Sequence, residues 1–182
     1  MRSIVEERKS NVVIMDVFSK LIQERIIFID DVIDDDLANA VIAQMLYLDS
    51  ISQKPINIYI NSPGGSVTSG LAIYDVSKLV KSEINTVCVG KAASMGAILM
   101  LMGKKRSITR HGRMMLHQVQ SAAIGTVEEM RSDMKITESL QDDLYKIVEE
   151  KTKLTNVKEL FYFDKWFNAQ ECFDSGIVNE IL

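Results

Sequence analysis

Gly90-Lys-Ala-Ala-Ser-Met-Gly96 lies between an apolar strand candidate at 84–89 and an apolar helix candidate at 94–102, and this order of features sets the fold class. Its small residues permit a sharp turn and a close approach of the backbone. A strand, a turn and a helix begin a β-α-β unit. The turn would place the Ser94 hydroxyl at the helix N-terminus, where free amides and the helix dipole favour negative charge. A serine chosen for tight packing or as an N-cap explains the same segment equally well.

The rest of the chain continues this alternation. Apolar patterns predict further strands at 25–29, 56–60, 107–109, 114–116 and 178–181, and further helices at 34–48, 71–80, 126–153 and 168–176. Thr126-Val-Glu-Glu129 is a capping box that opens the long helix. This alternation predicts an α/β fold of stacked β-α-β units with right-handed crossovers. Residues 1–18 mix charged and apolar side chains, which predicts a flexible N-terminal arm before a single domain over residues 19–182.

The composition is typical of a soluble globular protein, with 47% hydrophobic and 25% charged residues in a chain of 182. The net charge of −4 gives no general attraction to nucleic acid or to anionic membranes. Cys88 and Cys172 are too few for a disulfide framework or a metal site, and Cys88 is expected to be a buried, unreactive thiol. The longest near-apolar run, 92–102, has about half the length that a membrane span requires. These features predict a cytoplasmic protein that binds neither nucleic acid nor membrane.

Two histidines limit the choice of a general base. His111 lies in the polar turn Thr-Arg-His-Gly-Arg and is expected to be solvated. His117 follows Met-Met-Leu at the end of a predicted buried strand, where side chains project into a cleft. A histidine at a strand end is more often a hydrogen-bonded structural residue than a base, so this position alone is weak support for catalysis.

Two further segments suit acyl transfer. Asn61-Ser-Pro-Gly-Gly65 follows a strand end, and its consecutive glycines expose amides that can bind an oxyanion, although an ordinary turn explains them too. Asp164 lies among aromatic residues in Phe-Tyr-Phe-Asp-Lys-Trp-Phe, where a buried carboxylate would need a histidine or an arginine as its partner. Together with Ser94 and His117, these groups are the components of a serine hydrolase.

In order and spacing, these motifs resemble the Clp peptidase subunit family over nearly the whole chain. The resemblance rests on Tyr59-Ile-Asn-Ser-Pro-Gly-Gly65, Ile73-Tyr-Asp75, Gly90-x-Ala-Ala-Ser-Met-Gly-Ala97, Met115-Leu-His-Gln118 and the final segment from Asp164. The site residues that it implies are Ser94, His117 and Asp164 as the catalytic triad, Gly65 and Met95 as the oxyanion hole, and Gln118 and Val119 as substrate-binding residues.

The resemblance also implies a crotonase-like fold with a protruding long helix, here 126–153. Family members are serine endopeptidases that use no metal or cofactor. They assemble as seven-membered rings stacked in pairs and receive protein substrates from AAA+ Clp unfoldases. The sequence has no Walker A pattern, so ATP would belong to the partner. Apolar residues on the long helix fit such an assembly, although packing on the helix's own sheet explains them as well.

The chain departs from the family pattern at several positions. Proline and two glycines usually follow the glutamine at 118, but here the sequence is Val119-Gln-Ser-Ala-Ala-Ile-Gly125. Phe163 replaces an arginine that usually precedes the triad aspartate, and Leu79 replaces a phenylalanine of the unfoldase-docking pocket. These departures predict a divergent paralogue that has an intact triad but differs in assembly and partner specificity.

Two alternatives stay open on the sequence. A catalytically weak ring subunit that supports an active paralogue would explain Phe163 and the segment after Gln118, whereas the intact triad opposes it. A crotonase-type acyl-CoA hydratase or thioesterase would share the fold and the oxyanion chemistry, but a Ser/His/Asp set is not typical of that class.

Overall fold

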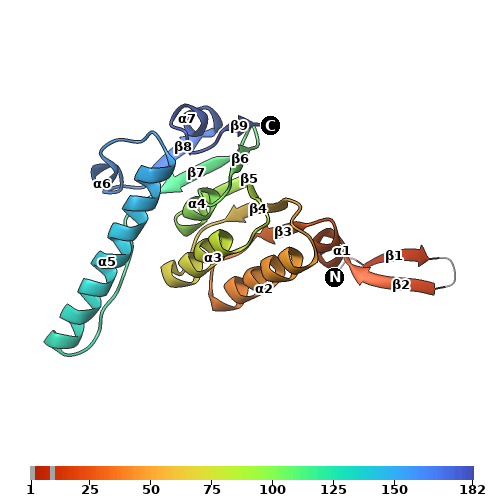
Figure 1. Cartoon of the computed structure of the whole chain (residues 1–182). Coiled ribbons are helices and arrows are strands. Elements are labelled where there is room, and N and C mark those ends of the chain that lie inside the picture. The colour runs from red at the N-terminus through yellow and green to blue at the C-terminus, as the bar shows by residue number, and fades with distance from the viewer. Residues whose placement is uncertain (1–2, 9–10) are drawn as a thin grey trace.

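The computed structural model describes residues 3–8 and 11–182 and is built on one mostly parallel sheet (Figure 1). Strands β3, β4, β5, β6 and β9 lie in this order, and β7 and β8 continue the sheet from β5. The strands are β3 (Ile26–Ile29), β4 (Ile56–Ser62), β5 (Ile84–Ala93), β6 (Lys105–Ile108), β7 (Arg113–Leu116), β8 (Lys165–Asn168) and β9 (Glu180–Ile181). Each pair in this sheet is parallel except β7 with β8. The predicted α/β class is confirmed.

β5 pairs with different neighbours along its length. Its residues 85–88 pair with β6, whereas residues 91–93 pair with β7. Gly90, with a φ of +82°, lies between these two parts. The sheet therefore divides at β5, and the branch that contains β7 and β8 adjoins the Ser94 turn.

Helices connect the parallel strands as the β-α-β pattern predicts, and the long α5 projects away from the sheet (Figure 1). The helices are α1 (Val17–Gln23), α2 (Asp35–Ile51), α3 (Val67–Leu79), α4 (Met95–Met100), α5 (Val127–Lys151), α6 (Val157–Leu160) and α7 (Ala169–Asp174). α5 begins at the predicted capping box, in which the Thr126 and Glu129 side chains accept from each other's backbone N–H groups. Within the described ranges, no helix combines the length and hydrophobicity that a membrane span requires.

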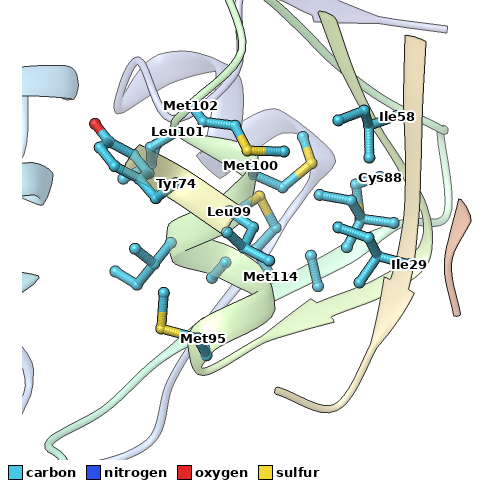
Figure 2. Close-up of a cluster of buried hydrophobic side chains, with 14 of the residues drawn as sticks. Ile29, Ile58, Tyr74, Cys88, Met95, Leu99, Met100, Leu101, Met102 and Met114 are labelled. Atoms are coloured by element: carbon cyan, nitrogen blue, oxygen red, sulfur yellow. The ribbon is translucent and has the colours of Figure 1, made fainter. Parts of the chain in front are cut away.

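The core is formed by the inner faces of the central strands and by α4. Alternate residues of β4 are buried, as the two-residue period of a strand requires. Every residue of α4 is buried, and Figure 2 shows its side chains in the same apolar cluster as Ile29, Ile58 and Cys88. The Cys88 thiol is buried as expected, and its desolvation raises its pKa to about 12. A fully buried helix directly after the Ser94 turn holds that turn against the core.

The N-terminal arm contains more regular structure than the sequence predicts. β1 (Ser3–Arg8) and β2 (Asn11–Asp16) form an antiparallel hairpin that extends away from the sheet (Figure 1). α1 then begins at Val17, inside the range 1–18 that was assigned to the arm, because the Asp16 side chain accepts the Ser19 N–H as an N-cap. Flexibility of the arm stays a prediction, and its residues 1–2 and 9–10 lie outside the described residues.

Several other element boundaries differ from the predicted ones. α3 begins at Val67 rather than at 71, because Ser66 caps it. The strand expected at 178–181 is limited to Glu180 and Ile181. β8 was not predicted, because in the sequence Lys-Trp-Phe-Asn only Phe167 is buried and no apolar alternation is visible.

Candidate active site

The register of the sheet places Ser94 and His117 at neighbouring strand ends. β5 and β7 are parallel, and Ala93 of β5 pairs with Met115 of β7. Ser94 directly follows β5, and His117 directly follows β7. Both side chains therefore lie at the carboxyl ends of adjacent parallel strands, which is the usual location of sites in α/β folds.

The serine turn is held in a strained conformation. Ser94 has φ +53° and ψ −123°, which non-glycine residues adopt only where the surrounding structure enforces it. Its N–H donates to the Met115 carbonyl at 2.8 Å, which ties the turn to β7. The Ser94 Oγ then lies 2.8 Å from His117 Nε2, within hydrogen-bond distance. Sequence reasoning did not identify this anchoring role of Met115, because it depends on strand register rather than on residue type.

Asp164 reaches the same place through the antiparallel strand β8. Leu116 of β7 lies opposite Lys165 of β8, so the residue before β8 enters the sheet beside His117. Asp164 Oδ1 is 3.6 Å from His117 Nδ1, which is longer than a well-formed hydrogen bond. The third member of the predicted triad is therefore adjacent to the histidine, but its contact is loose.

The expected burial of Asp164 is wrong. Its side chain is 63% exposed, whereas that of His117 is 16% exposed. The aromatic residues beside it do not cover it, because Tyr162 and Phe163 are themselves 60% and 83% exposed. The aromatic segment around Asp164 is only partly apolar in the fold: Phe161 and Phe167 are buried, but the aromatic residues before Asp164, Tyr162 and Phe163, are exposed.

The glycine turn after β4 depends on the absence of side chains. The Ile33 N–H donates to the Gly64 carbonyl at 2.9 Å, and the Ser66 N–H donates to the Ile33 carbonyl at 2.7 Å. A Cβ on Gly65 would overlap the Ile33 backbone, and one on Gly64, whose φ is +98°, would lie 2.6 Å from the Ser94 Cβ. The turn can therefore approach Ser94 only with glycine at these positions.

The two predicted oxyanion-hole amides are free to bind a ligand. Among the described residues, neither the Gly65 N–H nor the Met95 N–H donates to a protein acceptor. Met95 is the first residue of α4, where N–H groups lack intrahelical partners. Gly65 and Met95 both line the cavity that contains Ser94.

This cavity has a volume of about 460 Å³ and combines polar groups with an apolar wall. Its polar members include Ser94, His117 and Asp164. Its apolar members are Pro63, Val67, Met95, Ile98, Met115, Val119, Leu144 and Phe161. A nucleophile, a base, free amides and an apolar wall together suit acyl transfer on a substrate with an apolar side chain.

Gln118 and Val119, the predicted substrate-binding residues, form part of the cavity wall. The Gln118 N–H donates to the Phe161 carbonyl at 3.0 Å. The Val119 N–H donates to Gln141 Oε1 on α5 at 2.5 Å. Sequence reasoning did not identify Gln141, because no sequence signal joins a glutamine on α5 to a residue in the coil after β7.

His111, the other candidate base, does not line this cavity. His111 is exposed in a turn in which the Gly112 N–H donates to the Thr109 carbonyl at 2.8 Å. This position agrees with the expectation that His111 is a solvated loop residue.

Comparisons with known proteins agree with this arrangement. The family model for "Clp protease" matches residues 8–182. A Bacteroides fragilis protein named ATP-dependent Clp protease proteolytic subunit is 42% identical over 98% of this chain and 89% of its own length. Proteins with the same name from Bacteroides thetaiotaomicron and Porphyromonas gingivalis are 42% and 39% identical, over 98% and 99% of this chain and 84% and 83% of their own lengths.

These similarities extend across the serine, histidine and aspartate segments and leave no part of the sheet unmatched. Neither the acyl-CoA enzyme nor the weak supporting subunit is favoured by them. The chain belongs to the Clp protease family, a family of serine peptidases.

Proposed function

We propose that Ser94 is the nucleophile, His117 the general base and Asp164 the acid that orients the histidine. The observation that carries this proposal is the 2.8 Å separation of Ser94 Oγ and His117 Nε2. His117 takes the Ser94 proton as the oxygen attacks the peptide carbonyl, and then donates that proton to the leaving amine. Water, deprotonated in turn by His117, hydrolyses the acyl-enzyme and regenerates Ser94.

The Gly65 and Met95 amides stabilise the tetrahedral oxyanion in this proposal. Their N–H groups have no protein acceptor among the described residues and border the cavity. Preorganised donors of this kind contribute strongly to acyl transfer because they act where negative charge develops. Gln118 and Val119 contact the extended substrate along one wall, and the apolar residues of the cavity accept a substrate side chain.

The relatives' name supports an assembly. They are named as the proteolytic subunit of an ATP-dependent protease. We infer that this chain likewise encloses its sites in a chamber, built from seven-membered rings stacked in pairs, and receives substrates from a Clp unfoldase. The cytoplasmic location of the complex stays a prediction from the sequence, and so does the presence of a paralogue in its rings.

Fluorophosphonate labelling tests the proposed nucleophile. The purified protein is treated beside a Ser94→Ala variant, and mass spectrometry locates the adduct. Labelling at Ser94, absent in the variant, is expected because a serine activated by histidine reacts with this probe. Labelling at another residue, or equal labelling of both proteins, would contradict the assignment.

A further inference from the structure

The segment after β7 forms one wall of the cavity without being a helix or a strand. Residues 117–125 have no regular secondary structure and lead to the start of α5. Two hydrogen bonds hold the first part of this wall: the Gln118 N–H donates to the Phe161 carbonyl, and the Val119 N–H donates to Gln141 Oε1. Only the second bond depends on the identity of a side chain, so it is the one that a substitution can remove.

Val119 lies between two hollows of the molecule. One is the cavity of about 460 Å³ at Ser94, and the other is a groove of about 390 Å³ against α5. The groove is lined by Gln118, Val119, Thr137, Glu138, Gln141, Asp142 and Tyr145. Gln118 and Val119 line both hollows, whereas Gln141 lines the groove alone. The position of Val119 therefore shapes the catalytic cavity, and Gln141 acts on it from the side away from the reacting atoms.

The part of α5 that carries Gln141 is firmly placed. Leu144, Tyr145 and Val148, within two turns of Gln141, are the buried residues of this helix. Tyr145 packs edge-on against Phe161 at a ring distance of 5.2 Å, and Phe161 provides the acceptor for the Gln118 N–H. The same packed helix end therefore supports both bonds of the wall.

The oxygen of the Gln141 side-chain amide holds the cavity wall at Val119. Oε1 accepts the Val119 N–H, while Nε2 is buried and has no partner among the described residues. An unpaired buried donor is unfavourable, so packing alone would favour an apolar side chain of similar volume. Such a side chain would leave the Val119 N–H without its acceptor, which explains why a side chain with an acceptor oxygen is found there.

We propose that Gln141 is a positioning residue for substrate binding: it holds Val119, and with it the wall of the catalytic cavity, in the place that an extended peptide requires. This inference rests on the proposed function, because it assigns the wall to substrate binding. Within the described residues, the Gln141 hydrogen bond goes to Val119, and Gln141 does not line the cavity of Ser94 and His117. It therefore affects the binding of extended peptides rather than the reactivity of the serine.

The test compares Gln141→Leu with Gln141→Glu. Leucine has a similar volume but no acceptor, whereas glutamate keeps the acceptor and removes the unpaired donor. Gln170→Leu is the matched control, because Gln170 is exposed on α7, where its amide donates to Asp174, and it does not line the catalytic cavity. The measurements are kcat and KM for a fluorogenic peptide that spans the cleft, the rate of Ser94 labelling by a small fluorophosphonate, and hydrogen exchange of the Val119 amide.

For Gln141→Leu we expect a rise in KM of about three- to tenfold, as for the loss of one hydrogen bond, and faster exchange of the Val119 amide. The labelling rate should stay within about twofold of wild type, since the serine and its base are untouched. Gln141→Glu should restore both KM and exchange, and Gln170→Leu should change neither.

An unchanged KM in Gln141→Leu despite faster exchange at Val119 would overturn the inference, as would a parallel loss of labelling and peptide cleavage. If Gln141→Leu lowers the melting temperature too far for assay, Gln141→Glu and Gln141→Ala are compared instead, and equal KM values for these two would also overturn it. Failure of the proposed function is distinguishable, because wild type itself would then show no Ser94 labelling.

Discussion

The Ser94–His117 contact and the His117–Asp164 contact differ in quality. The first spans 2.8 Å and is partly buried, whereas the second spans 3.6 Å and involves a carboxylate that is 63% exposed. Solvent weakens an electrostatic contact of the second kind. The histidine is therefore placed mainly by β7, and Asp164 adds less to its orientation than a buried carboxylate would.

Substituting the two partners separately should expose this difference. His117→Ala is expected to lower kcat for a peptide by roughly 10⁶-fold, because the base is lost. Asp164→Asn should cause a loss that is smaller by at least about a hundredfold, since triad aspartates contribute less than the serine or histidine. Steady-state kinetics on both variants measures the difference between their losses of kcat, and circular dichroism is the control for folding. Equal losses would show that Asp164 orients the base as strongly as a buried acid.

Gly65 should tolerate no side chain. A Cβ there would overlap the Ile33 backbone, so Gly65→Ala must move the turn and its free amide. Loss of one oxyanion donor lowers kcat by about 10²–10³-fold. Gly125→Ala is the control, because Gly125 does not line the cavity at Ser94 and the atoms nearest to its Cβ, from 2.8 Å, belong to the Glu129 side chain. Wild-type kcat in Gly65→Ala would exclude this turn from the oxyanion hole.

Among the secondary-structure elements, those with strong apolar periodicity were predictable and those fixed by tertiary pairing were not. β3, β4, β5 and the helices between them follow from burial patterns that the sequence displays. β8 has one buried residue, and only its antiparallel pairing with β7 makes it a strand. The triad residues could be named because their motifs are distinctive. The exposure of Asp164 and the contact with Gln141 could not, because both depend on how distant segments pack.

α5 should depend on its capping box at the projecting end. Residues near its start are exposed, and its buried residues lie only in its second half. Thr126→Ala removes a cap that stabilises a helix by about 1 kcal/mol, so amides near residue 130 should exchange about fivefold faster. Hydrogen exchange with mass spectrometry measures this, and mid-helix Ser139→Ala is the control. Unchanged exchange in Thr126→Ala would mean that contacts with other subunits, rather than the cap, hold this end.

At the scale of the whole molecule, α5 presents apolar surface that suits contact with another subunit. Met130 and Met134 are 38% and 57% exposed, and Ile136 is 58% exposed. If rings stack through this helix, the double substitution Met130→Glu/Met134→Glu should halve the assembled mass, because it places charge in an apolar contact. Light scattering after size-exclusion chromatography measures the mass. A full-size assembly in this variant would exclude this helix face from the contact.

Stability at acid pH should fall in part through Asp49, a carboxylate that joins α2 to the turn between α3 and β5. Asp49 accepts from the Ser82 hydroxyl and from the Ser82 and Lys81 N–H groups, and these bonds lower its pKa below 3.8, the hydroxyl bond most. Asp49 therefore contributes fully to folding stability above the pKa that it has in the unfolded chain. This contribution is lost as the pH falls through its lower pKa in the folded protein. The pKa of an unperturbed Asp is about 3.9. As the pH is lowered from about 5 to about 3, the melting temperature of wild type should therefore fall more than that of Asp49→Asn. Parallel pH curves would contradict this assignment.

The late position of β8 in the chain has a consequence for biosynthesis. Ser94 and His117 leave the ribosome well before Asp164, and β8 can pair with β7 only when the C-terminal part of the chain has emerged. β9, which pairs with β6, is made last of all. A nascent subunit thus carries its nucleophile long before it carries a complete site. Translation itself therefore delays the complete triad until the segment that contains Asp164 and β8 has been made.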